Sequence, residues 1–293
     1  MKILILTHNN DRHYYLCNQI IKKSENTIGV ITGCKSINRS GKEKIYYLLK
    51  NYYFLYFIKN KVINFIFNKI GMKLAKEKVL SEKKYFGGSE AYFKENYKHL
   101  LLTKVDKSDR SINDKRFISI IQSKSPDLII VMGACLIGKK IISSAKNIIN
   151  IHTGLSPYYR GSYTNLWPII NDDFGFFGVT IHLMSLGIDS GDIVFTSQPK
   201  IKLNDSYSDI NSECIKIGAS LVIDAIKLAR TNKLYSTKQW EKGKLFLNKQ
   251  MNFFIAYKYY KNKKKYMLKH YELEKTLNLP MVKLVSKGRI INV

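Results

Sequence analysis

Short apolar runs alternate with amphipathic segments along the first part of the chain. Residues 2–7 and 27–32 are compact apolar runs, typical of buried parallel strands. The segment 14–23 between them has the spacing of a helix. This order of strand, helix and strand predicts the opening of an α/β sheet. The loop at residues 7–11 lacks the glycine pattern of dinucleotide sites, so we do not expect NAD there.

The same alternation continues through the middle of the chain. Further strands are expected at residues 128–132, 148–152, 178–184 and 192–195. Further helices are expected at residues 113–122, 138–145 and 207–231. The pattern therefore predicts an α/β domain over residues 1–231, with a mostly parallel sheet.

Two segments depart from this pattern because they are basic and rich in aromatic residues. Residues 42–80 have helical spacing, and we interpret them as a helical insertion that packs on the body of the protein. The alternative is a basic interfacial helix that contacts an anionic membrane. Residues 232–293 form a C-terminal extension, expected to be helical because it lacks the alternation and turns of a barrel.

The net charge of +27 is carried almost entirely by these flanking segments. Residues 35–84 hold 13 basic and 3 acidic side chains, and residues 230–293 hold 16 and 3. Residues 126–229 hold 8 basic and 9 acidic side chains and are nearly neutral. A cationic surface attracts nucleic acid, anionic lipid and phosphorylated substrates alike, so charge alone does not choose the partner.

Cysteine usage and hydropathy bear on the compartment. No two of the four cysteines have CxxC or zinc-finger spacing, which favours reduced thiols in a cytoplasmic protein. The apolar start is too short for a signal peptide. No charge-free stretch reaches the ~20 residues of a spanning helix. The cysteines are Cys17, Cys34, Cys135 and Cys214.

Polar side chains gather at the ends of two predicted strands. Asn150 and His152 alternate in one strand, so they project from the same face at its carboxyl end. Open α/β sheets bind their ligands at that end. A second strand contains His182 and leads into a loop with Asp189 before Ser-Gly. These four side chains are the candidate reactive groups.

The ordered motif resembles the formyltransferase family that uses 10-formyltetrahydrofolate. That family includes glycinamide ribonucleotide, methionyl-tRNA and amino-sugar enzymes. The resemblance spans about residues 1–230 and is sharpest over 126–195. It implies a Rossmann-like α/β fold, a mostly parallel sheet with helices on both faces. The residues that carry the resemblance are Asn150-x-His152, Pro157, Arg160-Gly161, His182 and Asp189-Ser190-Gly191.

The chemistry of formyl transfer suits these side chains. Attack of an amine on a formyl carbon creates an oxyanion, which the amide of Asn150 can stabilise by donating a hydrogen bond. His152 can hold the oxyanion or move a proton near neutral pH. Asp189 can orient that imidazole and favour its protonated form, and it can relay the proton of the amine. The resemblance implies the same three catalytic roles, with His182 in support.

The resemblance also implies binding roles. The loop 158–165 is expected to bind the amine-bearing substrate, since its arginine can pair with a phosphate and its tyrosines can stack on a base or sugar. Gly133, Leu136 and Ile137 are expected to line the folate pocket. The predicted substrate-binding residues are Tyr158, Tyr159, Arg160, Tyr163 and Asn165.

Two alternatives of another class remain open. His152, His182 and Asp189 could be two histidines and a carboxylate around iron or zinc. That interpretation leaves Asn150 without a role, so no metal is expected. The basic flanks could instead belong to a nucleic-acid-binding or membrane-binding protein on an inactive transferase fold.

The sequence of the loop at 154–161, Gly-Leu-Ser-Pro-Tyr-Tyr-Arg-Gly, most resembles the corresponding loop of formyltransferases linked to surface polysaccharide. We therefore expect transfer to a nucleotide-linked amino sugar in lipopolysaccharide or capsule biosynthesis. The methionyl-tRNA enzyme is the alternative, and only that acceptor would make nucleic acid a partner. The sequence names neither the sugar nor the oligomeric state, and a homodimer stays open.

Overall fold

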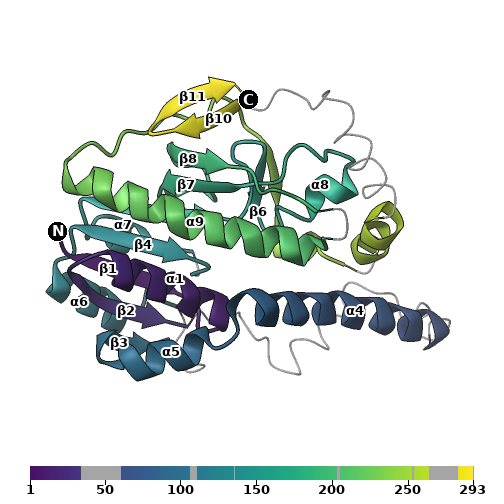
Figure 1. The fold of residues 1–293 in the computed structure, drawn as a ribbon, viewed down its shortest axis with the longest axis horizontal. Helices are drawn as coiled ribbons and strands as arrows, with labels where there is room; N and C mark the ends of the chain where they lie inside the picture. The colour runs from purple at the N-terminus through teal and green to yellow at the C-terminus, as the bar shows by residue number, and fades with distance from the viewer. Residues whose placement is uncertain are drawn as a thin grey trace.

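The protein is built on a seven-stranded sheet with the order β3-β2-β1-β4-β5-β7-β8 (Figure 1). The computed structural model describes residues 1–33, 61–105, 111–134, 136–202, 205–252, 254–263 and 283–292. The strands of this sheet are β1 (Ile3–Thr7), β2 (Thr27–Thr32), β3 (Leu101–Lys104), β4 (Leu128–Met132), β5 (Asn147–His152), β7 (Val179–Leu183) and β8 (Ile193–Ser197).

The first five strands in this order are parallel, and the last two are antiparallel to their neighbours. β1 pairs with β2 and β4, β2 with β3, and β4 with β5, all in parallel. β7 is antiparallel to both β5 and β8. Every residue of β1 and β4 is buried, as expected of strands covered on both faces. The predicted mostly parallel sheet is confirmed.

Helices cover both faces of the sheet. On one face α1 (Asp11–Lys23), α5 (Ser89–Asn96) and α9 (Tyr207–Arg230) share a core with Ile3 and Ile5. The opposite face packs α6 (Lys115–Lys124) and α7 (Lys139–Ile142) on alternate residues of the same strands. Alternate burial in β1 therefore serves two separate cores. The predicted Rossmann-like arrangement, with helices on both faces, is confirmed.

The long helix α4 (Lys61–Phe86) leads away from the sheet in Figure 1. The second half of α4 contacts the body of the protein, where Arg12 donates a hydrogen bond to Glu82 at 3.0 Å. The hydroxyl of Tyr259 donates to Glu77 at 3.2 Å. Residues 61–80 of the segment interpreted as a helical insertion are helical, and residues 42–60 lie outside the described residues. No helix in the described ranges is long and apolar enough to cross a membrane.

The C-terminal extension is not simply helical, so that prediction is wrong in part. Residues 254–263 are helical, but β9 (Lys244–Phe246), β10 (Lys283–Ser286) and β11 (Arg289–Asn292) are strands. β10 and β11 form a hairpin that contacts β8, and β9 pairs with β6 (Tyr159–Gly161). These strands have only three or four residues each, so they leave little periodicity in the sequence.

The remaining short elements join these layers. They are the helix α8 (Trp167–Ile170) and the 3₁₀ turns η1 (Lys98–Leu100) and η2 (Asn248–Gln250). Of the four cysteines, Cys17 and Cys214 are buried free thiols, and the other two lie outside the described residues.

Candidate active site

The antiparallel pairing of β5 with β7 places Asn150 directly opposite His182. Opposed residues of such a pair lie on the same face of the sheet, so their side chains meet. The amide nitrogen of Asn150 is 3.1 Å from Nε2 of His182. The predicted catalytic and supporting residues of two separate strands are thus adjacent in space.

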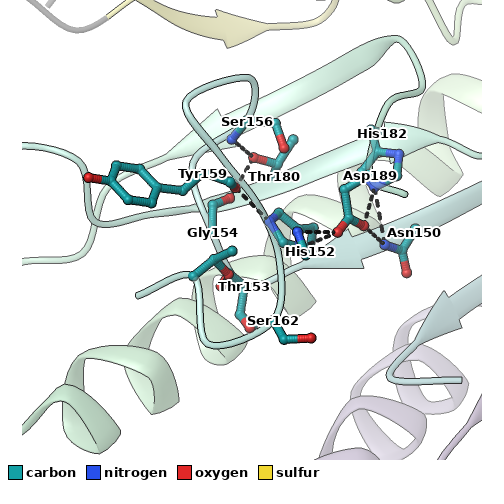
Figure 2. A network of polar contacts seen from close by, with 12 residues as sticks. Asn150, His152, Thr153, Gly154, Ser156, Tyr159, Ser162, Thr180, His182 and Asp189 are labelled. Carbon is teal, nitrogen blue, oxygen red and sulfur yellow. Dashed lines mark hydrogen bonds and ion pairs between the residues drawn. The ribbon is translucent and has the colours of Figure 1, made fainter. Parts of the chain in front are cut away.

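Asp189 lies on the loop between β7 and β8, and its carboxylate is the centre of the site (Figure 2). One oxygen, Oδ1, is 3.3 Å from the amide nitrogen of Asn150. The other, Oδ2, is 3.3 Å from Nδ1 of His152 and accepts a hydrogen bond from the backbone N–H of Gly161 at 2.9 Å. The three residues predicted to be catalytic therefore form one connected group.

The surroundings of Asp189 keep its carboxyl ionised. Burial by itself would raise the pKa of this group, because a buried charge loses its hydration. The imidazole of His152, the imidazole of His182 and the N–H of Gly161 have the larger combined effect in the other direction. The pKa of Asp189 is consequently held well below its ordinary value.

The Asn150 amide lies between His182 and Asp189. Nδ1 of His182 is 2.8 Å from the carbonyl oxygen of Leu183, so that nitrogen carries a hydrogen. Nε2 of the same ring is 3.1 Å from the Asn150 amide nitrogen and 3.4 Å from Oδ1 of Asp189, and the Asn150 amide donates to that oxygen. The amide oxygen of Asn150 points away from Asp189 in Figure 2.

Both ring nitrogens of His152 face oxygen acceptors. Nδ1 faces the carboxylate of Asp189, and Nε2 is 3.0 Å from the carbonyl oxygen of Tyr159. Only the doubly protonated ring can satisfy both acceptors at once. The ring is buried, at 5% exposure. Both nitrogens of the His152 ring are therefore held beside oxygen atoms of the protein.

The backbone around His152 is fixed by Thr180 of β7. The Thr180 hydroxyl accepts from the N–H of Ser156 at 2.9 Å and donates to the carbonyl of Gly154 at 2.7 Å. A Cβ atom at Gly154 would lie 2.5 Å from Nε2 of His152. The absence of a side chain at Gly154 is therefore required for the imidazole to occupy its position.

The loop predicted to bind the amine-bearing substrate is mostly packed into the protein. Tyr159 is buried, and its hydroxyl donates to Asp173. Arg160 is also buried and donates to the carbonyl of Gly243 at 3.3 Å. Asn165 exchanges two hydrogen bonds with the backbone of Gly178.

Two tyrosines of this loop are less enclosed. Tyr158 is half-buried against Phe176 and Trp240, whereas Tyr163 is 40% exposed. Of the five predicted substrate contacts, Tyr163 is thus the most accessible, and binding roles for all five stay predictions.

The predicted folate residues follow the carboxyl end of β4. Gly133 has φ +65, and a Cβ there would lie 2.5 Å from Cε1 of the buried His13. Leu136 is 73% exposed and Ile137 is buried. Asn113 holds this loop by donating to the carbonyl of Leu136 at 2.8 Å and accepting from the N–H of Gly138 at 2.6 Å. The contacts of these residues with folate stay predictions.

Three parts of the site could not be chosen from the sequence. They are the carbonyl of Tyr159, the N–H of Gly161 and the side chain of Gln239, which contacts the Asp189 loop. The first two are backbone groups, which every residue carries. Gln239 is distant in the sequence and belongs to no motif. Within the described residues, no group of three or more His, Cys, Asp or Glu side chains has the arrangement of a metal site.

This geometry agrees with comparison to known proteins. The formyl transferase family model matches residues 68–226, which include Asn150, His152, His182 and Asp189. The chain belongs to the formyl transferase family. The resemblance seen in the sequence is thereby confirmed.

Sequence relatives and solved structures agree with this family assignment. The chain is 32% identical to the methionyl-tRNA formyltransferase of Clostridioides difficile over 117 residues, which are 39% of this chain and 38% of that enzyme. It therefore matches about two-fifths of the length of that curated relative.

Two solved structures share the fold described above. A 4-N formyltransferase from Francisella tularensis has a TM-score of 0.55 at 17% identity, covering 100% of this chain and 96% of that one. A sugar N-formyltransferase from Shewanella sp FDAARGOS_354 has a TM-score of 0.53 at 14% identity, covering 100% and 96%. Identities this low show a shared fold.

Proposed function

We propose that this formyl transferase moves the formyl group of 10-formyltetrahydrofolate to the amine of a nucleotide-linked amino sugar. The observation that carries the proposal is the Asp189 carboxylate, which joins His152 and Asn150 at the carboxyl end of β5. The amino-acid sequence of the 154–161 loop supports a role in lipopolysaccharide or capsule synthesis.

In the proposed reaction the amine nitrogen forms a bond to the formyl carbon, and the carbonyl electrons move to its oxygen. The bond from that carbon to the folate nitrogen then breaks as the carbonyl re-forms. The amine loses one proton and the folate nitrogen gains one, so the transfer is balanced. Asp189 is ionised and can accept the proton of the amine, directly or through water. His152 can supply the other proton from Nε2.

The role of Asn150 follows from the bonds it already makes. The amide donates to Oδ1 of Asp189 at 3.3 Å. For Asn150 to stabilise the oxyanion, its side chain has to turn so that the amide hydrogen directed at Asp189 is released to the developing oxyanion. Once Asp189 takes up a proton from the amine, its attraction for that hydrogen falls. Oxyanion stabilisation and proton acceptance are coupled in this scheme.

The choice of acceptor rests on two kinds of likeness. Of the two structures named above, one is called a 4-N formyltransferase and the other a sugar N-formyltransferase. The alignment with each covers 100% of this chain. Sequence likeness to the methionyl-tRNA enzyme is higher but covers only 39% of this chain. A match that covers 39% of this chain and 38% of that enzyme supports formyl transfer as the reaction without favouring tRNA as the acceptor. An amino sugar is the acceptor we propose, and methionyl-tRNA is the alternative.

The direct test incubates the purified chain with 10-formyltetrahydrofolate and a panel of acceptors. The panel contains nucleotide-linked amino sugars with the amine at different ring positions, the same amino sugars without nucleotide, and methionyl-tRNA. We expect a nucleotide-linked sugar heavier by one carbonyl group in mass spectrometry. Formylated methionyl-tRNA as the sole product would replace the proposed acceptor with the alternative. Tightly bound stoichiometric metal together with no formyl product would instead favour the metal-dependent interpretation.

A further inference from the structure

Residues 237–246, which we call the strap, lie against two loops of the active site. The strap begins after residue 226, where the match to the family ends. At one end Thr237 exchanges two backbone hydrogen bonds with Ile193, both 2.8 Å long. At the other end β9 pairs in parallel with β6. The strap therefore spans from the loop of Asp189 to the loop of Tyr159.

Gln239 is the strap residue that contacts the Asp189 turn. Its Nε2 is 2.8 Å from the carbonyl oxygen of Asp189 and 2.9 Å from the carbonyl oxygen of Gly191. A side-chain amide has two hydrogens, so each carbonyl receives one. Asp189 has φ +45, in the left-handed region that residues other than glycine seldom adopt. Gln239 thus ties together both sides of an unusual turn.

The other end of the strap fixes the backbone groups that face the site. The N–H of Lys244 donates to the carbonyl of Tyr158 at 2.9 Å, and the N–H of Ser162 donates to the carbonyl of Phe246 at 2.8 Å. Between these two bonds lie the Tyr159 carbonyl, which faces His152, and the Gly161 N–H, which donates to Asp189. The strap consequently holds both the carboxylate and its backbone donor.

We propose that Gln239 is a positioning residue for formyl transfer, which fixes the turn so that the Asp189 carboxylate reaches His152, Asn150 and the Gly161 N–H together. This inference rests on the proposed function. Gln239 acts on the backbone of the turn, because both of these hydrogen bonds go to backbone carbonyls. It acts only through the placement of Asp189. The lowered pKa of that carboxyl depends on the same placement.

The first test replaces Gln239 by methionine, which keeps the length of the side chain and removes its donors. A matched control exists in Gln198, whose amide donates to the carbonyl of Gly175 in a loop without catalytic residues. For Gln239→Met we expect kcat to fall about 10- to 100-fold, with KM for both substrates within about 2-fold. Gln198→Met should keep the wild-type kcat. Wild-type kcat in Gln239→Met, or an equal loss in Gln198→Met, would overturn the proposal.

A second variant, Gln239→Glu, adds a readout that loss of packing would not change. The introduced carboxylate, when ionised, faces two carbonyl oxygens and repels them, whereas its protonated form donates one hydrogen bond. Activity relative to wild type should therefore recover as the pH falls. A ratio that does not change with pH would count against positioning by this hydrogen-bonded pair.

A third measurement does not need catalysis. Amide hydrogen exchange at Gly161, followed by NMR, reports the bond from its N–H to Asp189. In Gln239→Met this exchange should become faster, while the Ser162 N–H, bonded to Phe246, exchanges as in wild type. Unchanged exchange at Gly161 would overturn the positioning role. Wild-type protein that transfers no formyl group would overturn the proposed function alone.

Discussion

Nδ1 of His152 lies 3.3 Å from Oδ2 of Asp189, and the opposite nitrogen of the same ring faces a backbone carbonyl. Acceptors on both sides favour an imidazole that carries two hydrogens. The neighbouring carboxylate balances that charge in a buried place, where an unpaired cation would be costly. A proton donor and a proton acceptor thus lie side by side at the end of one strand.

Replacement of Asp189 by asparagine should nearly abolish formyl transfer. The neutral amide has no charge to balance His152, and it cannot accept the proton of the amine. We expect kcat/KM to fall by about 10²- to 10⁴-fold, the usual range for a general acid or base. Steady-state rates with the best acceptor of the panel would measure it. Asp127→Asn is a matched control, because that carboxylate accepts from the backbone N–H of Lys2 and precedes β4, at the end of the strand opposite the site.

Replacement of Asn150 by alanine should also be severe. It removes the donor proposed for the oxyanion, a loss that costs ~2.7–4 kcal/mol of barrier in comparable sites. That energy corresponds to roughly 10²- to 10³-fold in kcat. Thermal unfolding should show that the fold persists. Wild-type turnover by Asn150→Ala would remove this residue from the mechanism.

Acid should weaken the fold through Asp189 at low pH. Its folded pKa is depressed, so the group adds stability above the unfolded pKa of about 3.9 and loses that contribution as the pH falls through the folded value. Urea unfolding of wild type and Asp189→Asn should therefore differ most above about pH 4 and converge at lower pH. Parallel curves across this range would contradict the lowered pKa.

His13 should affect the stability of the fold at a higher pH than Asp189 does. Burial, then the Arg12 charge, lower its pKa well below the ordinary value, and its Nε2 accepts from Arg12. The unfolded chain takes up this proton first, so stability is full above about pH 6.5 and falls below it. In His13→Gln, the dependence of the unfolding free energy on pH should be shallower just below pH 6.5. An unaltered slope would show that His13 does not contribute.

A side chain at Gly133 should disturb the loop expected to contact folate. Gly133→Ala places a methyl group against His13 and imposes a left-handed backbone that costs a non-glycine residue roughly 1–2 kcal/mol. We expect a similar loss of stability and a raised KM for 10-formyltetrahydrofolate, with the KM for the acceptor little changed. Gly88→Ala is a useful comparison, because it also has positive φ but has open space around it. Equal effects on folate KM in both variants would argue against a folate role for Gly133.

The sequence predicted the sheet and the candidate catalytic residues because both are local patterns. β1 and β4 are continuous apolar runs, and Asn150 and His152 alternate in one strand. The motif order was enough to expect Asp189 beside them. The pairing of β5 with β7, which brings His182 to Asn150, follows from the sheet and not from either strand alone.

The substrate loop was harder to predict because residue type does not reveal burial. Arg160 and Asn165 look like surface ligands in the sequence, but both are enclosed and bonded to backbone groups. The strap was not predicted either. Its three-residue strand β9 is too short for periodicity and pairs with residues more than eighty positions earlier.

Both tryptophans of the chain lie at the strap, because Trp240 belongs to it and Trp167 of α8 packs on its residue Phe246. Trp167 stacks on Phe246 with ring centroids 4.3 Å apart. The ring centroids of Trp240 and Tyr158 are 5.8 Å apart. The sequence contains just these two tryptophans. Tryptophan fluorescence of the unlabelled protein therefore originates where the strap meets the loop 158–165. Stopped-flow mixing with either substrate can follow that junction in real time, without an added dye.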